Sequence, residues 1–506
     1  MKKNHKLSLF SAIIMVISTS IGVGVFIKNS QIINAVGGAI GFAVLAWVLS
    51  IFGLISIVIT FKYMMKQTPT NSLGMVGWNL KYNSNYFFQA AKKFMSYIHM
   101  PIYFFVFPIY AIMTLQNTFG FEISWWQCLL ISFGVCLWFI IFSGRFIVVA
   151  NVTNWIISFL KYIPLLVVPL IAFALIGRGD VASQTNWWQP NYDNVTTHFK
   201  TFSQLHISLG LLGSIPCVLF AFDGFYATAA LQQQMKKPKD CANAMLIGVL
   251  VVSTLDLLVS LSLLLATTHG NVDDYWAFAF ITNNKWIFYI IKILIVIGML
   301  AITNGLVAGA IVYYTTLIKN DQVIFSKLLK KHTNIDKPWG SIILCLFITF
   351  ATYLVLGVVG SLAFFDTGNY LSGISNFPGK GYGLHMENLY SFCDLLSNWV
   401  GVFAFVILVL AIAGAIKFNK KERIIPLIIF GSIAIGFICI CLLDILVSTV
   451  GDVVLASKAY ANNHNFDKSI LIGTIVQFAS LIAFSLILFA HKNKKIQNST
   501  LFRHKI

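Results

Sequence analysis

Long apolar runs separated by short polar segments dominate this chain. A helix needs about 20 consecutive apolar residues to cross the hydrocarbon core of a bilayer. At that length the pattern predicts an all-α polytopic membrane protein with about twelve transmembrane helices. The predicted spans are 8–27, 39–62, 94–117, 125–143, 146–176, 207–231, 243–267, 286–318, 338–360, 388–416, 424–449 and 468–490.

Composition agrees with this pattern. Of the 506 residues, 58% are hydrophobic and 10% are charged, whereas a soluble globular protein has about 25% charged residues. The values exclude a water-soluble enzyme and a disordered chain. Most of the eight cysteines fall inside apolar runs and none forms a C-x-x-C pair. They are therefore interpreted as small core residues, and no metal or cofactor is predicted.

The charged residues are informative when they are counted separately for each side of the membrane. The net charge is +18. With the N-terminus inside, the predicted cytoplasmic segments hold 26 lysines and arginines against four acids, and the outer segments hold seven against nine. This asymmetry predicts a multi-pass plasma-membrane protein with both termini cytoplasmic. It removes nucleic acid as a partner and makes residues 491–506 a basic cytoplasmic tail near anionic lipid.

Two spans contain residues that interrupt helices. Span 1 carries two glycines and three hydroxyl residues within positions 18–24, and span 6 carries Pro216, Asp223 and Gly224. Glycine destabilises a helix interior by roughly 1 kcal/mol, so these clusters predict unwound stretches. The candidate binding residues are Ser18, Ser20, Ile21, Gly22, Val23 and Gly24 in span 1, and Phe220, Ala221, Phe222, Asp223, Gly224 and Phe225 in span 6.

The two interruptions occupy corresponding positions if residues about 8–176 and 207–416 are two repeats. Paired interruptions of this kind are typical of transporters built on inverted repeats. Freed N–H groups suit a carboxylate and freed carbonyl groups suit an ammonium, so the breaks favour a zwitterionic substrate. The predicted organisation is a ten-helix transport core in residues 1–416, two further helices in 424–490 and the tail.

The same residues carry a family resemblance. Span 1 reads G-x-G-[IV]-F over residues 22–26, and span 6 reads F-A-[FY]-x-G-[FWY] over residues 220–225, followed by K-x-P-[KR] over residues 236–239. The loop after span 8 matches more weakly, through Tyr314 and Asp321. The chain resembles the amino acid–polyamine–organocation superfamily of transporters along most of spans 1–10.

This resemblance implies the five-plus-five fold of the leucine-transporter type with two added helices. It implies secondary active transport of amino acids by alternating access, either proton-coupled or by exchange. The substrate carboxylate would meet the amides of Gly22, Val23 and Gly24. The ammonium would meet carbonyl groups near Ser18, Ser20 and residues 220–222, and Phe222 or Phe225 would close over the substrate.

Ionisable residues inside spans are functional candidates, because an unpaired charge is costly in a bilayer. The resemblance implies ion or proton coupling for Lys161 in span 5, with an ion pair to Asp223 or a helix end as the alternative. Asp223 could instead bind a cationic side chain or cap the following helix. Asp394 could cap span 10. His99 in span 3 is interpreted as a hydrogen-bonded core residue, with a proton relay as the alternative. Thr303 and Asn304, polar residues at mid-depth in span 8, are secondary candidates for side-chain selectivity or for binding an ion, and Asp256 and Asp444 receive no role.

Other classes of membrane protein fit less well. A transporter of polyamines or other small amines shares the implied fold and remains an alternative. A membrane enzyme would need a clustered acid, base and nucleophile, and none of the usual motifs is present. A channel would need a filter loop or continuous pore helices. The six-plus-six transporter plan usually has a long loop between spans 6 and 7, whereas here that loop is only residues 232–242.

Overall fold

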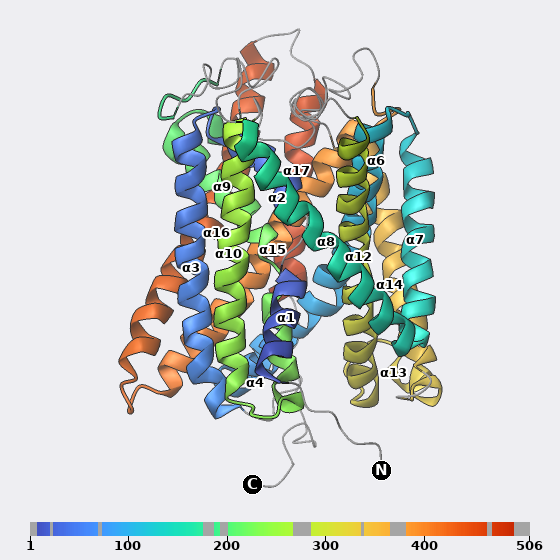
Figure 1. The fold of residues 1–506 in the computed structure, drawn as a ribbon, viewed down its shortest axis with the longest axis vertical. Coiled ribbons are helices and arrows are strands. Elements are labelled where there is room, and N and C mark those ends of the chain that lie inside the picture. Colours follow the sequence, from blue (N-terminus) through green and yellow to red (C-terminus); the bar gives the residue numbers. More distant parts are fainter. Residues whose placement is uncertain are drawn as a thin grey trace.

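The structure, a computed structural model, describes residues 8–20, 24–68, 73–175, 187–192, 201–266, 285–334, 338–364, 381–462 and 468–489. In this part of the chain the protein is a bundle of helices that run side by side, without a β-strand (Figure 1). The α-helices are α1 (Leu9–Ser20), α2 (Gly24–Ala35), α3 (Ile40–Gln67), α4 (Met75–Tyr82), α5 (Asn85–Phe94), α6 (Met100–Phe119), α7 (Trp125–Arg145), α8 (Ile147–Leu175), α9 (Ile207–Ala221), α10 (Asp240–Ala266), α12 (Lys285–Lys319), α13 (Ser326–Leu329), α14 (Trp339–Val358), α15 (Met386–Phe418), α16 (Ile425–Asn462) and α17 (Lys468–Phe489).

Short segments of other helix types connect several of these helices. Two π-helices continue α5 and α14, and three 3₁₀ helices lie before α9, after α9 and after α13. They are η1 (Met95–His99), η6 (Val359–Ala363), η3 (Phe202–Gln204), η4 (Phe225–Gln234) and η5 (Lys330–His332).

Within the described residues, nine helices are long and apolar enough to cross a membrane. They coincide with nine of the predicted spans. The three remaining predicted spans fall on α1 with α2, on α8, and on α9 with η4. The protein is therefore an all-helical polytopic membrane protein, while twelve spans and two inverted repeats stay predictions.

The bundle has an interior and a lipid-facing surface. Nearly every residue of α6 is buried, and most of α15 is buried as well. By contrast, α7 exposes Leu130 and Trp138, and α14 exposes Phe347 and Leu354. Apolar side chains on the outside of a helical bundle suit contact with lipid tails, because no water has to be ordered around them.

Local sequence sets the ends of the interior helix α6 and its neighbour. Gly120 ends α6 in the left-handed conformation with φ of +66°, which a glycine adopts without strain. Ser124 then begins α7 with a capping box in which its backbone N–H donates to Gln127 Oε1 at 2.8 Å. Because α6 ends at Phe119 and α7 begins at Trp125, the connection is short and the two helices pack side by side.

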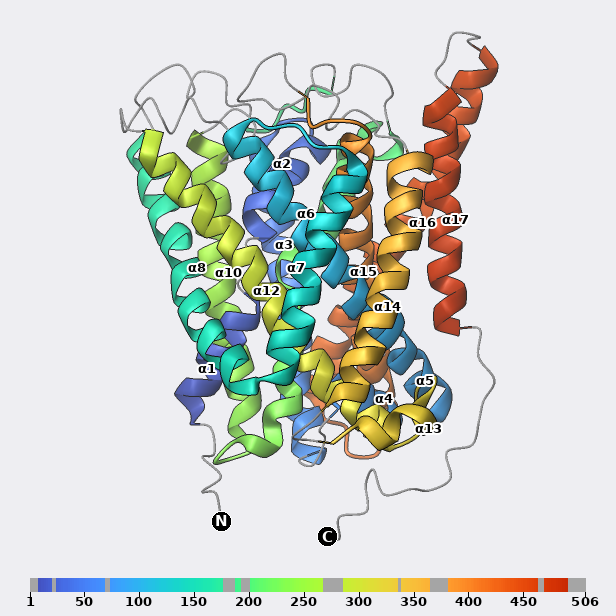
Figure 2. The ribbon, with the colours of Figure 1, turned by 90° about the vertical axis from the view of Figure 1, so that its right-hand side faces the viewer.

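The two last helices lie at one edge of the bundle (Figure 2). α16 packs on α15 and α3, and α17 packs on α16. α16 extends thirteen residues beyond the predicted end at 449. The extension carries Asp452, whose carboxylate accepts a hydrogen bond from the Phe202 backbone N–H at 2.6 Å. Asp444, on the same helix, is also buried.

Side chains of α4 bind the interior helix α15 near its end. α4 and α13 lie at the lower end of the bundle in Figure 2. Asn79 and Asn83 donate to the carbonyl groups of Ile407 and Leu410 at 3.1 and 2.9 Å. These bonds satisfy buried amides and attach the connection between α3 and α5 to α15.

Candidate functional site

The sixth predicted span is broken after Ala221. α9 ends there, Phe222 to Gly224 form a turn, and the chain continues from Phe225 as the 3₁₀ helix η4. Gly224 has φ of +107°, a conformation that residues with a Cβ atom rarely adopt. The turn lies where the sequence predicts an interruption, and it leaves backbone groups outside a continuous helical ladder.

The first predicted span is divided between α1, which ends at Ser20, and α2, which begins at Gly24. Ser18 lies in α1, and the Ser20 hydroxyl donates to the Val16 carbonyl at 2.7 Å. The predicted binding residues Ile21, Gly22 and Val23 lie outside the described residues.

The start of α2 lies directly against the end of α9. A Cβ atom added to Gly24 would lie 3.1 Å from the Ala221 Cα, and one added to Gly401 of α15 would lie 3.4 Å from the Phe220 Cα. The missing side chains let α2 and α15 approach the α9 backbone from both sides. The predicted residues of span 6 therefore meet the described end of span 1.

Asp223, within the turn, is held by residues of α6 and η1. The Tyr103 hydroxyl donates to Asp223 Oδ2, and His99 Nε2 lies 3.1 Å from the same oxygen. The Tyr226 hydroxyl lies 2.8 Å from His99 Nε2. The His99 and Asp223 side chains are each only 3% exposed. The predicted cap is wrong, since η4 begins after Gly224 and has no side-chain cap, whereas binding of a cationic side chain by Asp223 stays a prediction.

The position of His99 follows from the π-helix η1. A π-helical turn places one extra residue in the turn, rotates the following side chains and occurs often at functional sites. η1 also leaves the Ser96 carbonyl to accept a hydrogen bond from the Tyr314 hydroxyl at 2.6 Å. Tyr314 is one of the residues of the family motif, and it supports the turn that carries His99.

The three phenylalanines of the predicted site have different surroundings. Phe220 packs against Tyr103, with ring centroids 5.8 Å apart. Phe222 contacts Trp47 of α3 edge-on at 5.8 Å, and Phe225 stacks on Phe61 at 6.1 Å. Phe222 and Phe225, the predicted gate residues, are thus packed against α3 in this conformation.

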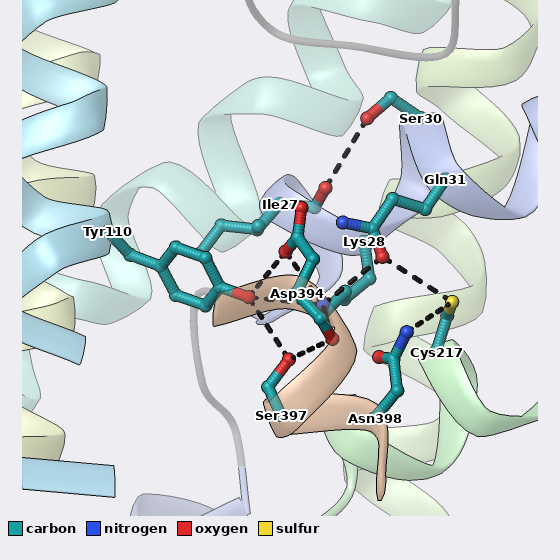
Figure 3. A network of polar contacts seen from close by, with 9 residues as sticks. All are labelled: Ile27, Lys28, Ser30, Gln31, Tyr110, Cys217, Asp394, Ser397 and Asn398. Atoms are coloured by element: carbon teal, nitrogen blue, oxygen red, sulfur yellow. Dashed lines mark hydrogen bonds and ion pairs between the residues drawn. The ribbon is translucent and has the colours of Figure 1, made fainter. Parts of the chain in front are cut away.

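A buried ion pair lies next to Phe220, and its contacts are drawn in Figure 3. Lys28 of α2 is fully buried, and its ammonium donates to Asp394 Oδ1 of α15 at 2.9 Å. The Tyr110 hydroxyl of α6 donates to the same carboxylate, and Lys28 Nζ lies 5.0 Å from the Phe220 ring centroid. The pair joins three helices within one turn of Gly24.

The contacts of this pair extend to α9 (Figure 3). Lys28 also donates to Gln31 Oε1 at 3.1 Å, and the Cys217 thiol of α9 lies 3.5 Å from the same oxygen. Asn398 Nδ2 of α15 donates to Cys217 Sγ at 3.4 Å. The sequence assigns Lys28 to an outer segment after span 1 and Asp394 to a possible helix cap. The structure places Lys28 within α2, and the cap is wrong because α15 begins at Met386 and Asp394 lies inside it.

Lys161 and Asp256 lie on the neighbouring helices α8 and α10 and interact electrostatically. Lys161 is 2% exposed, and both Asp256 oxygens are buried without a hydrogen-bond partner in the described structure. The predicted alternative partner of Lys161, Asp223, is bound to His99 instead. Asp256, which received no role from sequence, is therefore the acid that faces Lys161.

The two polar candidates on α12 have local partners. The Thr303 hydroxyl donates to the Met299 carbonyl at 3.4 Å within the helix. Asn304 Oδ1 accepts a hydrogen bond from the Ser143 hydroxyl and so joins α12 to α7. At the end of α12, Lys330 donates to Asp321 Oδ2 at 2.9 Å and holds the pKa of that carboxyl below its usual value.

Comparison with known proteins agrees with this architecture. The family model described as amino acid permease matches residues 7–478. An uncharacterized protein of Mycoplasma pneumoniae is 27% identical over 454 residues, which cover 84% of this chain and 80% of the relative. The range that the family model matches includes α1, α2, α8, α9, η4 and α15. The chain belongs to the amino acid permease family of the amino acid–polyamine–organocation superfamily.

Proposed function

We propose that the protein carries amino acids across the plasma membrane by alternating access around the turn between α9 and η4. The observation that carries this proposal is the contact of Gly24 with Ala221, which brings the start of α2 against the end of α9. Helix ends at membrane depth offer polar backbone groups that a continuous helix lacks. Two such ends at one place can bind both charged groups of a zwitterion.

In the proposed complex, the N–H groups around residues 22–24 bind the substrate carboxylate, favoured by the positive end of the α2 dipole. Carbonyl groups near Ser18, Ser20 and residues 220–222 bind the ammonium. Phe220 supports this assignment, because it lies at the end of α9 before the turn, contacts Lys28 and Tyr103, and can cover a small ligand.

Closure of the outer side is assigned to the Lys28–Asp394 pair. The pair lies on the α2 side of the break, and α2 lies above α1 in Figure 1, toward the end opposite α4 and α13. Its separation would release α2 from α15 and open a path to the turn. The contacts of α4 with α15 would close the other side, which the lysine-rich loops predict to be cytoplasmic, with both termini.

Coupling is assigned to Lys161. Its burial next to Asp256 makes the charge of either residue costly without the other. Proton release from Lys161 would therefore change the interaction of α8 with α10. This can link substrate movement to a proton gradient, or Lys161 can act as a fixed charge in an exchanger.

Transport of polyamines is the second candidate. Such substrates need several carboxylates for their ammonium groups. In the described part of the site, Asp223 is already bound to Tyr103 and His99, and Asp394 is already bound to Lys28. These pairings favour a substrate that brings its own carboxylate.

The proposal is tested with purified protein in liposomes. Uptake of each radiolabelled proteinogenic amino acid is compared with uptake of putrescine and spermidine, with empty liposomes as the control. Saturable uptake of one or more amino acids is expected. Uptake of polyamines alone, or flux that does not saturate with concentration, would contradict amino acid transport by alternating access.

A further inference from the structure

His99 and Asp223 form a buried acid–base pair that the proposed transport cycle does not yet use. His99 Nε2 lies 3.1 Å from Asp223 Oδ2, and both side chains are 3% exposed. Two atoms of this pair, His99 Nδ1 and Asp223 Oδ1, are buried without a hydrogen-bond partner among the described residues. Buried polar atoms are normally satisfied, so an exception on both partners of one pair requires an explanation.

We propose that His99 and Asp223 together hold one exchangeable proton and form a second proton-binding site, in addition to Lys161. The proposal rests on the proposed transport function. Histidine is the side chain whose charge ordinarily changes between about pH 5 and 8. Here it is bound to an acid located in the turn itself, so its proton is attached to the part of the protein that has to move.

The position of Tyr226 supports two protonation states. With the proton present, Nε2–H donates to Asp223 Oδ2 and the Tyr226 oxygen lies beside it. With the proton removed and the remaining ring hydrogen on Nδ1, Nε2 can accept a hydrogen bond from the Tyr226 hydroxyl, 2.8 Å away. Tyr103 donates to Asp223 in both states. When the proton is lost, His99 therefore gives up its hydrogen bond to Asp223 in the turn and gains one from Tyr226 in η4.

The groups that face the pair come from four elements. Tyr103 of α6 and Tyr226 of η4 are its titratable neighbours, and Tyr314 of α12 binds the carbonyl of Ser96 in the same π-turn as His99. The remaining ring contact of His99 is with Phe94 of α5, 5.7 Å between centroids. In the described structure the countercharge of a protonated His99 is therefore Asp223.

The test is a titration that needs no transport substrate. The chain has ten histidines, and ¹³Cε1-labelled protein in nanodiscs gives one NMR signal for each. The signal missing from His99→Gln identifies His99. We expect it to titrate in the wild type and its midpoint to change in Asp223→Asn, which loses the countercharge and should lower the midpoint.

Tyr226→Phe should move the same midpoint in the opposite direction, because it loses the donor that stabilises the emptied pair. Lys161→Met is the matched control and should leave the His99 titration in place. A His99 signal that does not titrate, or that titrates identically in Asp223→Asn and Tyr226→Phe, would overturn the proton site. Folding of each variant is checked by its elution profile and melting temperature.

Uptake then connects the site to transport. His99→Gln should lose the part of the pH profile whose midpoint matches the His99 signal. If the signal titrates but His99→Gln keeps the wild-type profile, the role in transport is wrong. If no amino acid is transported by the wild type, the proposed function fails, while the titration still decides whether the pair binds a proton.

Discussion

The ammonium of Lys28 lies 2.9 Å from the carboxylate of Asp394, although 366 positions separate these residues in the chain. Lys28 is fully buried and Asp394 is nearly so. A buried pair adds little net stability over a well-packed apolar pair, but removing one partner leaves an uncompensated charge. The pair is therefore suited to joining and releasing two helices.

Removal of the acid alone should lower the stability more than removal of both charges. Asp394→Asn leaves the Lys28 ammonium buried without its countercharge and is expected to lower the free energy of unfolding by about 3–5 kcal/mol. Lys28→Met combined with Asp394→Asn should recover most of that loss. Melting temperatures in detergent rank the variants by stability. As a control, Lys330→Ala breaks the exposed pair with Asp321 and should leave the melting temperature unchanged. Equal melting temperatures for the single and double variants would contradict the assignment.

Cys217 offers a native reporter of opening beside this pair. Its thiol lies 3.5 Å from Gln31 Oε1 and is buried, whereas Cys439 is exposed. In a Cys439→Ser background, a membrane-impermeant maleimide added outside should label Cys217 slowly. Asp394→Asn should accelerate labelling at least several-fold, because it releases α15 from α2. Mass spectrometry of the Cys217 peptide gives the rate, and an unchanged rate would show that the pair does not close the outer side.

The contact between Gly24 and Ala221 predicts a sharp effect of one methyl group. Gly24→Ala places a Cβ atom 3.1 Å from the Ala221 Cα, so α2 and α9 have to separate slightly. Uptake should fall by an order of magnitude or more, since small displacements in a binding site cause losses of this size. Gly309→Ala on α12 is the matched control, because its Cβ atom would have nothing within 4 Å. Similar uptake by both variants would remove Gly24 from the site.

Lys161 should be needed for accumulation but not for exchange. Lys161→Met removes the group proposed to release a proton, so an imposed pH gradient should no longer drive uptake. Exchange of external for internal amino acid should persist. Parallel assays in liposomes with a buffered interior separate the two. Accumulation by Lys161→Met at the wild-type level would assign coupling to another group. Asp256→Asn should lower the melting temperature less than Asp394→Asn does, because Lys161 is proposed to release its proton and then leaves no uncompensated charge.

The sequence predicts the helix breaks better than it predicts the buried pairs of charged residues. Gly224 and Asp223 interrupt an apolar run, so the turn between α9 and η4 could be placed from local chemistry alone. The partner of Asp223 is 124 positions away, and its reach depends on an extra residue in the π-helix η1. No pattern of apolar residues reveals that insertion.

A weaker signal for the pairs was present nonetheless. Charges inside apolar spans have to find partners. Away from their ends, the predicted spans hold only two lysines and four aspartates, which are Lys161, Lys292, Asp223, Asp256, Asp394 and Asp444. Lys28 lies one residue beyond span 1. Which acid meets which base is decided by helix packing, and that information is absent from a single sequence. For the same reason, the position of Asn304 at mid-depth in its span makes it a candidate but does not reveal that its side chain binds Ser143 on α7.

The length of α16 has a consequence for the two helices beyond the predicted ten-helix core. Its 38 residues span about 57 Å, nearly twice the thickness of a bilayer core. Asp452, in the part of α16 beyond the predicted end at 449, binds the backbone of Phe202 just before α9 begins. Helices outside the core are thus anchored to the segment that leads into the broken helix. A chain shortened after α15 would keep the candidate binding residues and lose this attachment of the segment that leads into α9.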